Sequence, residues 1–267
     1  MDHVNVSSIF QIGGFGELMS GIVYCVGVGP GDPELMTLKA VRIISRADII
    51  VVPGKSVEKS VAWKIASQAV PELNIKKAVA VDMPMTSDRE VLFKAHRKGA
   101  DIIEKYLDED KDVAYLTLGD PTIYCSFHYL QLVLNKEGYK TVIINGITSF
   151  CASAAKLGIS LTQGEENLSI IGAGHNDYKN YNNHNKKSWD NTNLVIMKSG
   201  KNMRSVKEAL NAACDDNKEY YAVTNCGMED ERCYNSLQDI PDDAGYYTLI
   251  IGRCKSHCEE DERIKNG

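Results

Sequence analysis

The chain has 267 residues, of which 43% are hydrophobic and 25% charged, and a formal net charge of −6 from 36 acidic and 30 basic residues. This length can bury the core of one large domain or two modest ones, and the composition is that of an ordinary soluble protein. The acidic balance argues against a nucleic-acid surface. No apolar run approaches the roughly 20 residues of a membrane span, and no basic segment precedes Lys39, so we expect a cytoplasmic protein without nucleic-acid or membrane partners.

Residues 1–20 contain glycines but no sustained period, and we expect a disordered extension whose deletion leaves activity unchanged. From Gly21 onward, short β-branched runs alternate with helical patterns. The predicted strands are residues 22–28, 48–52, 78–81, 113–118 and 141–144. Strand and helix in repeated alternation predict an α/β domain over residues 21–144 with an open, mainly parallel sheet.

Three of the intervening helices are predicted from apolar residues spaced three and four apart. Their apolar positions are Leu35, Leu38, Val41 and Ile44; Val61, Ile65 and Ala69; and Val91, Ala95, Ile102 and Tyr106. Ser87 and Glu90 form a possible capping box for the third. A fourth helix is expected after the turn at Pro121.

The pattern changes around residues 145–146. Helices are predicted at 149–157 and 204–213, and strands at 168–171, 194–197, 220–223 and 246–251. Fewer helices per strand predict a mixed sheet in a second α/β domain over residues 145–254, followed by a flexible tail at 255–267. The asparagine-rich segment 174–193 is predicted to be a polar surface loop or a lid.

The sequence contains eight cysteines. Because Cys25, Cys125 and Cys151 lie in apolar or helical runs of a sizeable chain, we expect free thiols. Cys254, His257 and Cys258 have a spacing that could bind a soft metal, but they begin an acidic tail and no second ligand pair accompanies them. We therefore expect no metal site.

The loop at residues 27–32, Gly-Val-Gly-Pro-Gly-Asp, leaves the first predicted strand. Three glycines in five positions permit a tight turn and a close approach to a ligand. A dinucleotide loop is one interpretation. Pro30 removes a backbone donor that a phosphate would need, however, and the spacing departs from Gly-x-Gly-x-x-Gly, so we favour another kind of ligand.

Two further loops follow predicted strands, at residues 118–124 (Leu-Gly-Asp-Pro-Thr-Ile-Tyr) and 146–149 (Gly-Ile-Thr-Ser). The carboxylate of Asp120 could bind an amine or hydroxyl, or could simply cap the next helix. Thr148 and Ser149 could likewise be ordinary N-caps. Because ligands gather at the carboxyl ends of parallel strands, we expect the three loops to form one site.

In their order and spacing, these three loops, with residues 38–40 (Leu-Lys-Ala) and 47–51 (Ala-Asp-Ile-Ile-Val) between them, resemble the tetrapyrrole (corrin/porphyrin) methyltransferases over residues 21–254. Residues 83–86 (Met-Pro-Met-Thr) followed by Asp88, the run 121–124, and Met197 and Lys198 followed by Gly200 and Lys201 are similar to the branch that methylates C20 of precorrin-2 or cobalt-factor II. The resemblance implies the two-domain fold of that family, S-adenosyl-L-methionine as cofactor with S-adenosyl-L-homocysteine as product, a tetrapyrrole substrate, and a homodimer.

Carried over position by position, the resemblance implies functional residues. Those of the cofactor pocket would be Pro30, Leu118, Gly119, Asp120, Ile123, Thr148, Ser149, Met197, Gly227 and Thr248. Those that meet the substrate would be Gly29, Gly31, Lys55, Arg89 and Lys198, with Lys39 and Lys201 as further cations for its carboxylates. Asp32 and Tyr124 are candidate bases for the proton lost after methyl transfer, although Asp32 could instead hydrogen-bond its own turn.

Two alternatives stay open at this point. One is another homologue: a uroporphyrinogen-III or later corrin methyltransferase, or diphthine synthase, which acts on a protein. The other is a non-catalytic module that binds a nucleotide or a tetrapyrrole. Tetrapyrrole turnover separates the methyltransferases from a protein-modifying enzyme, and binding of NAD in preference to S-adenosylhomocysteine would indicate a nucleotide module.

Overall fold

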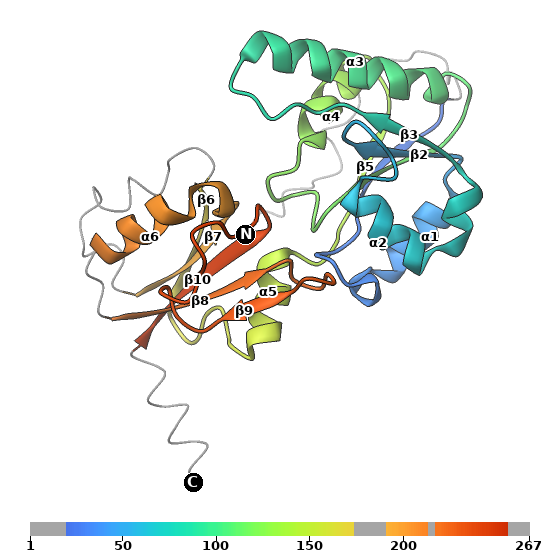
Figure 1. Ribbon diagram of the computed structural model, residues 1–267. Helices are drawn as coiled ribbons and strands as arrows, with labels where there is room; N and C mark the ends of the chain where they lie inside the picture. The colour runs from blue at the N-terminus through green and yellow to red at the C-terminus, as the bar shows by residue number, and fades with distance from the viewer. Residues whose placement is uncertain (1–19, 174–190, 213–216, 256–267) are drawn as a thin grey trace, which may run out of the picture.

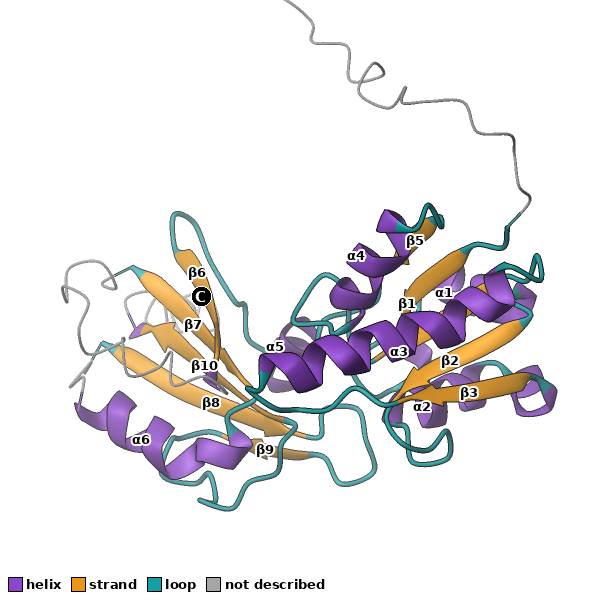
Figure 2. Ribbon diagram, turned by 90° about the horizontal axis from the view of Figure 1, so that it is seen from above, coloured by secondary structure: helices purple, strands orange, loops and turns teal. Residues whose placement is uncertain are grey.

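The computed structural model describes residues 20–173, 191–212 and 217–255, except for the side chain of Lys201. These residues form two α/β units, each built on a five-stranded sheet (Figure 1). The two sheets lie side by side along an elongated molecule (Figure 2). Residues 1–19 of the expected extension, most of the asparagine-rich segment, and the tail beyond Lys255 with His257 and Cys258 lie outside the described residues.

The first sheet is parallel throughout. Its strands are β1 (Val23–Gly27), β2 (Ile49–Pro53), β3 (Lys77–Val81), β4 (Val113–Thr117) and β5 (Thr141–Ile144), in the order β3-β2-β4-β1-β5. The predicted parallel sheet is confirmed. The three inner strands read as continuous apolar runs because helices cover both faces of the sheet, so alternate residues on either side are buried.

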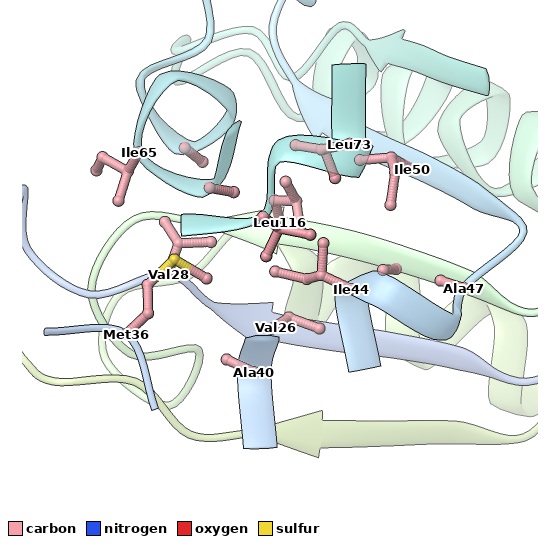
Figure 3. Close-up of a cluster of buried hydrophobic side chains, with 14 of the residues drawn as sticks. Val26, Val28, Met36, Ala40, Ile44, Ala47, Ile50, Ile65, Leu73 and Leu116 are labelled. Carbon is pink, nitrogen blue, oxygen red and sulfur yellow. The ribbon is translucent and has the colours of Figure 1, made fainter. Parts of the chain in front are cut away.

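One face is covered by α1 (Leu38–Arg46), α2 (Val61–Ala69) and the 3₁₀ helices η2 (Pro33–Leu35) and η3 (Pro71–Ile75), and the other by α3 (Arg89–Leu107) and α4 (Phe127–Lys136). Figure 3 shows the first of these cores, in which Ile44, Ile65 and Leu73 meet strand residues such as Leu116. Successive residues of β1 alternate between the two cores. Val26 faces α1 and α2, whereas Cys25 faces α3 and α4.

The predicted apolar face of α1 is confirmed at Val41 and Ile44 but wrong at Leu35 and Leu38. Leu35 is 37% exposed and Leu38 is 87% exposed, while Ala40 and Ile44 are buried. The hydroxyl of Thr37 accepts from the amide of Ala40, so the helix begins at Leu38. Leu38 then lies roughly 200° around the helix axis from Ala40 and points to solvent.

The predicted capping box of α3 is also wrong. Asp88 is the N-cap: its Oδ1 accepts from the amides of Glu90 at 2.9 Å and Val91 at 3.2 Å. Aspartate and serine cap comparably well, so the sequence alone allowed either register. With this start, Val91 is 45% exposed and the buried face of α3 begins further along.

The second sheet is mixed, as predicted. Its strands are β6 (Asn167–Gly172), β7 (Thr192–Met197), β8 (Lys218–Thr224), β9 (Arg232–Tyr234) and β10 (Thr248–Cys254), in the order β6-β7-β10-β8-β9, and only β6 and β7 pair in parallel within the described residues. One face packs against α5 (Ser149–Leu157), and the other against α6 (Met203–Ala212), which follows η7 (Gly200–Asn202). The helix predicted at 149–157 is confirmed.

Two strands of this sheet differ from the prediction. The strand expected at 246–251 begins at Thr248 and continues to Cys254, and the short edge strand β9 was not predicted. A three-residue edge strand is too short for a recognisable alternation. The division into domains at 144/145 stays a prediction, although β5 ends at Ile144 and α5 packs on the second sheet.

The described residues also test the expected state of the cysteines and the expected absence of a membrane-spanning helix. The six cysteines among them are all free thiols, as expected for these positions. In the same part of the chain, no helix has both the length and the apolar character needed to cross a bilayer.

Candidate active site

The three glycine-containing loops meet because β1 lies between β4 and β5, so the carboxyl ends of these strands are neighbours. The backbone joins two of the loops directly: the amide of Val28 donates to the carbonyl of Thr117 at 3.0 Å. Gly29 and Gly119 exchange hydrogen bonds in both directions, at 3.3 and 2.7 Å. The first and second loops therefore form one continuous surface at the edge of the sheet.

Most glycines of these loops serve backbone packing. A Cβ on Gly146 would lie 2.2 Å from the carbonyl oxygen of Gly119 and 2.9 Å from the carbonyl carbon of Gly27. A Cβ on Gly27 would lie 2.6 Å from the same Gly119 oxygen. These residues are glycines because three strand ends converge on one another, and the close approach is to protein backbone.

Gly119 is different. Its φ is +71°, and a Cβ there would have the carbonyl oxygen of Ile147, 4.0 Å away, as its nearest neighbour. By contrast, a Cβ on Gly29 would lie 3.2 Å from the carbonyl oxygen of Leu35. The missing side chain of Gly119 thus faces open space, where a ligand can approach the backbone.

Asp120 holds two loops together. Its side chain is buried; Oδ1 accepts from the amide of Thr122 at 2.8 Å and from the hydroxyl of Thr122. Oδ2 accepts from the amide of Gly146 at 2.9 Å and from Nδ2 of Asn145 at 3.2 Å. Burial raises the pKa of Asp120, but these hydrogen bonds outweigh burial and leave the pKa below its ordinary value.

The sequence allowed Asp120 either to bind an amine or hydroxyl of a ligand or to cap the next helix. The carboxylate does not cap α4, because Ser126 is the N-cap of that helix. Both carboxylate oxygens accept hydrogen bonds from the protein. In this structure Asp120 therefore holds residues 119–122 in place against residues 145–146. Sequence reasoning missed Asn145 as a partner. The signal was present as an Asn-Gly pair directly after a strand, which is typical of a turn whose Asn side chain bonds nearby groups.

Thr148 has an unsatisfied hydroxyl. It occupies the N-cap position of α5, yet its side chain makes no capping hydrogen bond, so simple side-chain capping is the wrong interpretation. Its Oγ1 is buried and has no hydrogen-bond partner among the residues that the structure describes. Such a group costs about 1–3 kcal/mol unless a ligand or water satisfies it. Ser149, the first residue of α5, is half-buried beside it.

The loop at 27–32 also meets the second sheet. A Cβ on Gly31 would lie 2.3 Å from the carbonyl oxygen of Cys226, and one on Gly227, whose φ is +74°, would lie 2.5 Å from the amide nitrogen of Asp32. Oδ1 of Asp32 accepts from the amide of Glu34 at 2.8 Å, so Asp32 does hydrogen-bond its own turn. The buried Pro30 lies in the same loop. This loop therefore packs directly against the turn that follows β8.

Tyr124 and Lys198 form a second contact between the sheets. Both have positive φ, +48° and +59°, a conformation that side chains other than glycine rarely adopt. Nζ of Lys198 lies 5.3 Å from the centroid of the Tyr124 ring, and the Tyr124 hydroxyl donates to the carbonyl of Ile170 at 3.5 Å. Burial lowers the pKa of Lys198. Strained backbone on both sides of one contact is typical of a functional site.

The remaining predicted pocket residues divide between apolar contacts and internal hydrogen bonds. Ile123 and Met197 pack against the same apolar cluster beneath α5, and Leu118 packs against the core of the first sheet. Thr248 is 1% exposed; its hydroxyl donates to the carbonyl of Gly245 at 2.7 Å and bonds the hydroxyl of Thr224 at 2.9 Å. The hydroxyl of Thr248 is therefore already engaged within the protein.

Lys55 and Arg89 are exposed, after β2 and at the start of α3. Within the described part of the chain, neither makes a hydrogen bond or ion pair with the loops above. The structure thus brings together the predicted residues of segments 29–32, 118–124, 146–149, 197–198 and 227, whereas the site role of these two cations stays a prediction.

The similarity of this chain to known proteins includes nearly all of these segments. The family model of the tetrapyrrole (corrin/porphyrin) methylases matches residues 22–241. A probable cobalt-precorrin-2 C(20)-methyltransferase of Methanocaldococcus jannaschii is 42% identical over 153 residues, which are 57% of this chain and 64% of that protein. The chain thus spans just under two thirds of the length of this relative. A precorrin-2 C(20)-methyltransferase of Sinorhizobium is 26% identical over 232 residues, 85% of this chain and 92% of that protein.

A solved structure has the same fold. The uroporphyrin-III C-methyltransferase of Thermus thermophilus, complexed with S-adenosylhomocysteine, superposes with a TM-score of 0.62 over 87% of this chain and 97% of that one, at 23% identity. The family match runs from β1 beyond β9 and includes the three converging loops. The chain therefore belongs to the tetrapyrrole (corrin/porphyrin) methylase family.

Proposed function

We propose that this protein transfers a methyl group from S-adenosyl-L-methionine to C20 of precorrin-2 or of cobalt-factor II, in cobalamin biosynthesis in the cytoplasm. Family membership and the names of the two relatives support this reaction. The structural observation that carries the proposal is the convergence of residues 29–32, 119–124 and 146–149, next to residues of the second sheet, with an open position at Gly119 and an unsatisfied hydroxyl at Thr148. As part of the proposal, the protein acts as a homodimer.

The residues present fit the proposed cofactor. Gly119 leaves its backbone accessible, Thr148 offers a hydroxyl without a partner, and Ile123 and Met197 provide half-buried apolar surface nearby. Apolar walls with a few convergent polar groups are usual for a cofactor pocket. Asp120 would act indirectly, because its oxygens hold the loops that carry these groups.

In this reaction the protein has mainly to position the cofactor and the substrate relative to each other. When bound, S-adenosylmethionine supplies an electrophilic sulfonium methyl group, so no strong nucleophile is required of the chain. Tyr124 and Lys198 would face the macrocycle: the phenol is half-exposed at the domain contact, and the ammonium would meet a substrate carboxylate. Tyr124 and Asp32 are the two candidates to accept the proton lost after transfer.

The direct test is transfer of labelled methyl from S-adenosylmethionine, with precorrin-2, cobalt-factor II and uroporphyrinogen III each offered anaerobically. We expect one methyl group on one of the first two substrates, and NMR should locate it at C20. Methylation of uroporphyrinogen III alone, or at another carbon, would refute the C20 assignment. Transfer to none of the three with S-adenosylhomocysteine still bound would point to another homologue.

Lys198→Met is expected to raise KM for the tetrapyrrole roughly tenfold, with little change in the affinity for S-adenosylhomocysteine. The change removes the charge but retains the length of the buried stem, and one lost ion contact to a carboxylate is worth about 1–3 kcal/mol. Lys64→Met, on the exposed surface of α2, is the matched control and should leave KM unchanged. Equal KM values for the Lys198 variant and the parent protein would show that Lys198 does not bind the substrate.

A further inference from the structure

Two cysteines face each other beside the candidate site. Cys25, on β1, is fully buried in the core beneath α3 and α4, and Cys125 packs against the same core from the loop after Tyr124. The two thiols lie close enough for each to shift the pKa of the other. Sγ of Cys125 also lies 3.4 Å from Oγ1 of Thr117. Sequence reasoning treated both cysteines as buried thiols and missed the pair, because 99 positions separate them in the chain.

The fold explains why they meet. Alternation along β1 points Cys25 toward α4. Tyr124 has a left-handed conformation and is half-exposed, whereas the next side chain, Cys125, packs against the core beneath α3 and α4. The two cysteines therefore reach the same core from β1 and from the loop before α4.

The two thiols differ in character. Hydrogen bonding from Cys25 lowers the pKa of Cys125 to about 6; burial opposes this, and Thr117, the amide of Phe127 and the charge of Lys198 reinforce it. Burial raises the pKa of Cys25 well above its ordinary value, and Cys125 and Asp120 raise it further. The buried hydroxyl of Tyr115 also faces the pair. Cys125 is consequently a thiolate at neutral pH, and Cys25 a protonated thiol.

Small reagents have a route to Cys125. It lines a cavity of about 500 Å³ together with Tyr124, Phe127, His128 and Ile143. Cys25 lies behind it and is closed to solvent. An accessible, acidic thiol with a second thiol in the same cluster is the arrangement of a reactive cysteine with its resolving partner.

We propose that Cys125 and Cys25 are a modification site that forms a reversible disulfide on exposure to a hydroperoxide. With hydrogen peroxide, the Cys125 thiolate attacks one oxygen, the O–O bond breaks, and the other oxygen leaves as hydroxide, so that Cys125 becomes a sulfenic acid. The sulfur of Cys25 then attacks that of Cys125, the S–O bond breaks, and the Cys25 proton leaves with the hydroxyl as water. The thiolate and the thiol together lose two electrons, and one hydrogen peroxide is reduced to one water and one hydroxide, which takes a proton from solvent.

The disulfide would also act on the candidate site, an effect that rests on the proposed function. It removes the negative charge that faces Lys198 and ties the residue next to Tyr124 to β1. Methyl transfer should therefore fall at least fivefold after oxidation and return after treatment with dithiothreitol. Formation of the disulfide itself does not depend on the identity of the substrate.

The test is mass spectrometry of the full-length protein, digested without reduction after treatment with hydrogen peroxide. A peptide pair linked through Cys25 and Cys125 is expected in the parent protein and in the control Cys233→Ser, whose thiol is exposed, and is expected to be absent from Cys25→Ser and Cys125→Ser. In Cys25→Ser, dimedone should trap a sulfenic acid on Cys125. Absence of the linked pair, or over-oxidation of Cys125 beside a free Cys25, would overturn the proposal.

Alkylation by iodoacetamide gives an independent measurement. From pH 7 to pH 8 the rate at Cys125 should rise less than twofold because the thiolate is already formed, whereas an ordinary thiol gains roughly eightfold. Cys233 is the internal control, since burial and Glu231 raise its pKa. An eightfold rise at Cys125 would contradict its role as the attacking thiol. If methyl transfer is absent in every form while the linked peptide still appears, the proposed function fails and the modification site stands.

Discussion

Replacing Gly119 by alanine is expected to weaken binding of S-adenosylhomocysteine at least tenfold, which is about 1.4 kcal/mol, while the protein remains folded. The new methyl group would meet no protein atom closer than 4.0 Å, so it would project into the space proposed for the cofactor. The positive φ of +71° adds about 1–2 kcal/mol of backbone strain. Calorimetric titration gives the affinity, and urea unfolding gives the stability.

Gly158→Ala is the matched control for this prediction. Gly158 ends α5 with a φ of +68°, and a Cβ there would also have no neighbour within 4 Å. The strain is therefore nearly the same, but no ligand is proposed at that position. We expect equal losses of stability in the two variants and weaker binding only in Gly119→Ala. Equal affinity of the two variants for S-adenosylhomocysteine would show that Gly119 does not line the cofactor pocket.

Asp120→Asn is expected to lower the free energy of unfolding by about 2–4 kcal/mol at pH 7. An amide has one acceptor oxygen, so its NH2 group would face either the amide of Thr122 or that of Gly146 in a buried position. The loss should also reduce cofactor affinity, because the two loops would no longer be aligned. Asp88→Asn is the control, since asparagine caps a helix as well as aspartate does.

The same variant should change the dependence of stability on pH. The folded-state pKa of Asp120 lies below the unfolded value of about 3.9, so its stabilisation is present above that value and is lost as pH falls through the folded pKa. The difference in stability between parent and variant should therefore shrink below about pH 4. The role of Asp120 in holding the two loops together would be contradicted by either of two results. One is a free energy of unfolding within about 0.5 kcal/mol of the parent at pH 7, and the other is a difference that grows in acid.

The parallel first sheet and α5 could be predicted because their signals are local. Apolar β-branched runs indicate strands buried on both faces, and the helix at 149–157 starts after a Gly-x-Thr turn and ends at Gly158. The exposed faces of α1 and α3 could not be predicted in the same way. The cap is chosen by hydrogen bonds that spacing does not specify, so an apolar residue at a predicted helix start, such as Leu35 or Val91, can lie before the helix or on its exposed side.

The sequence by itself determined the α/β class, the three glycine loops at strand ends and the family resemblance, because each depends on residues close together in the chain. Only the tertiary structure decided what the individual residues do. Gly146 meets Gly27, Gly31 meets Cys226, Asp120 bonds Gly146, and Cys25 meets Cys125. These contacts join distant segments, and their distances depend on how two sheets and their loops pack. Sequence spacing therefore predicted which loops converge, and packing determined the contacts of each residue within the candidate site.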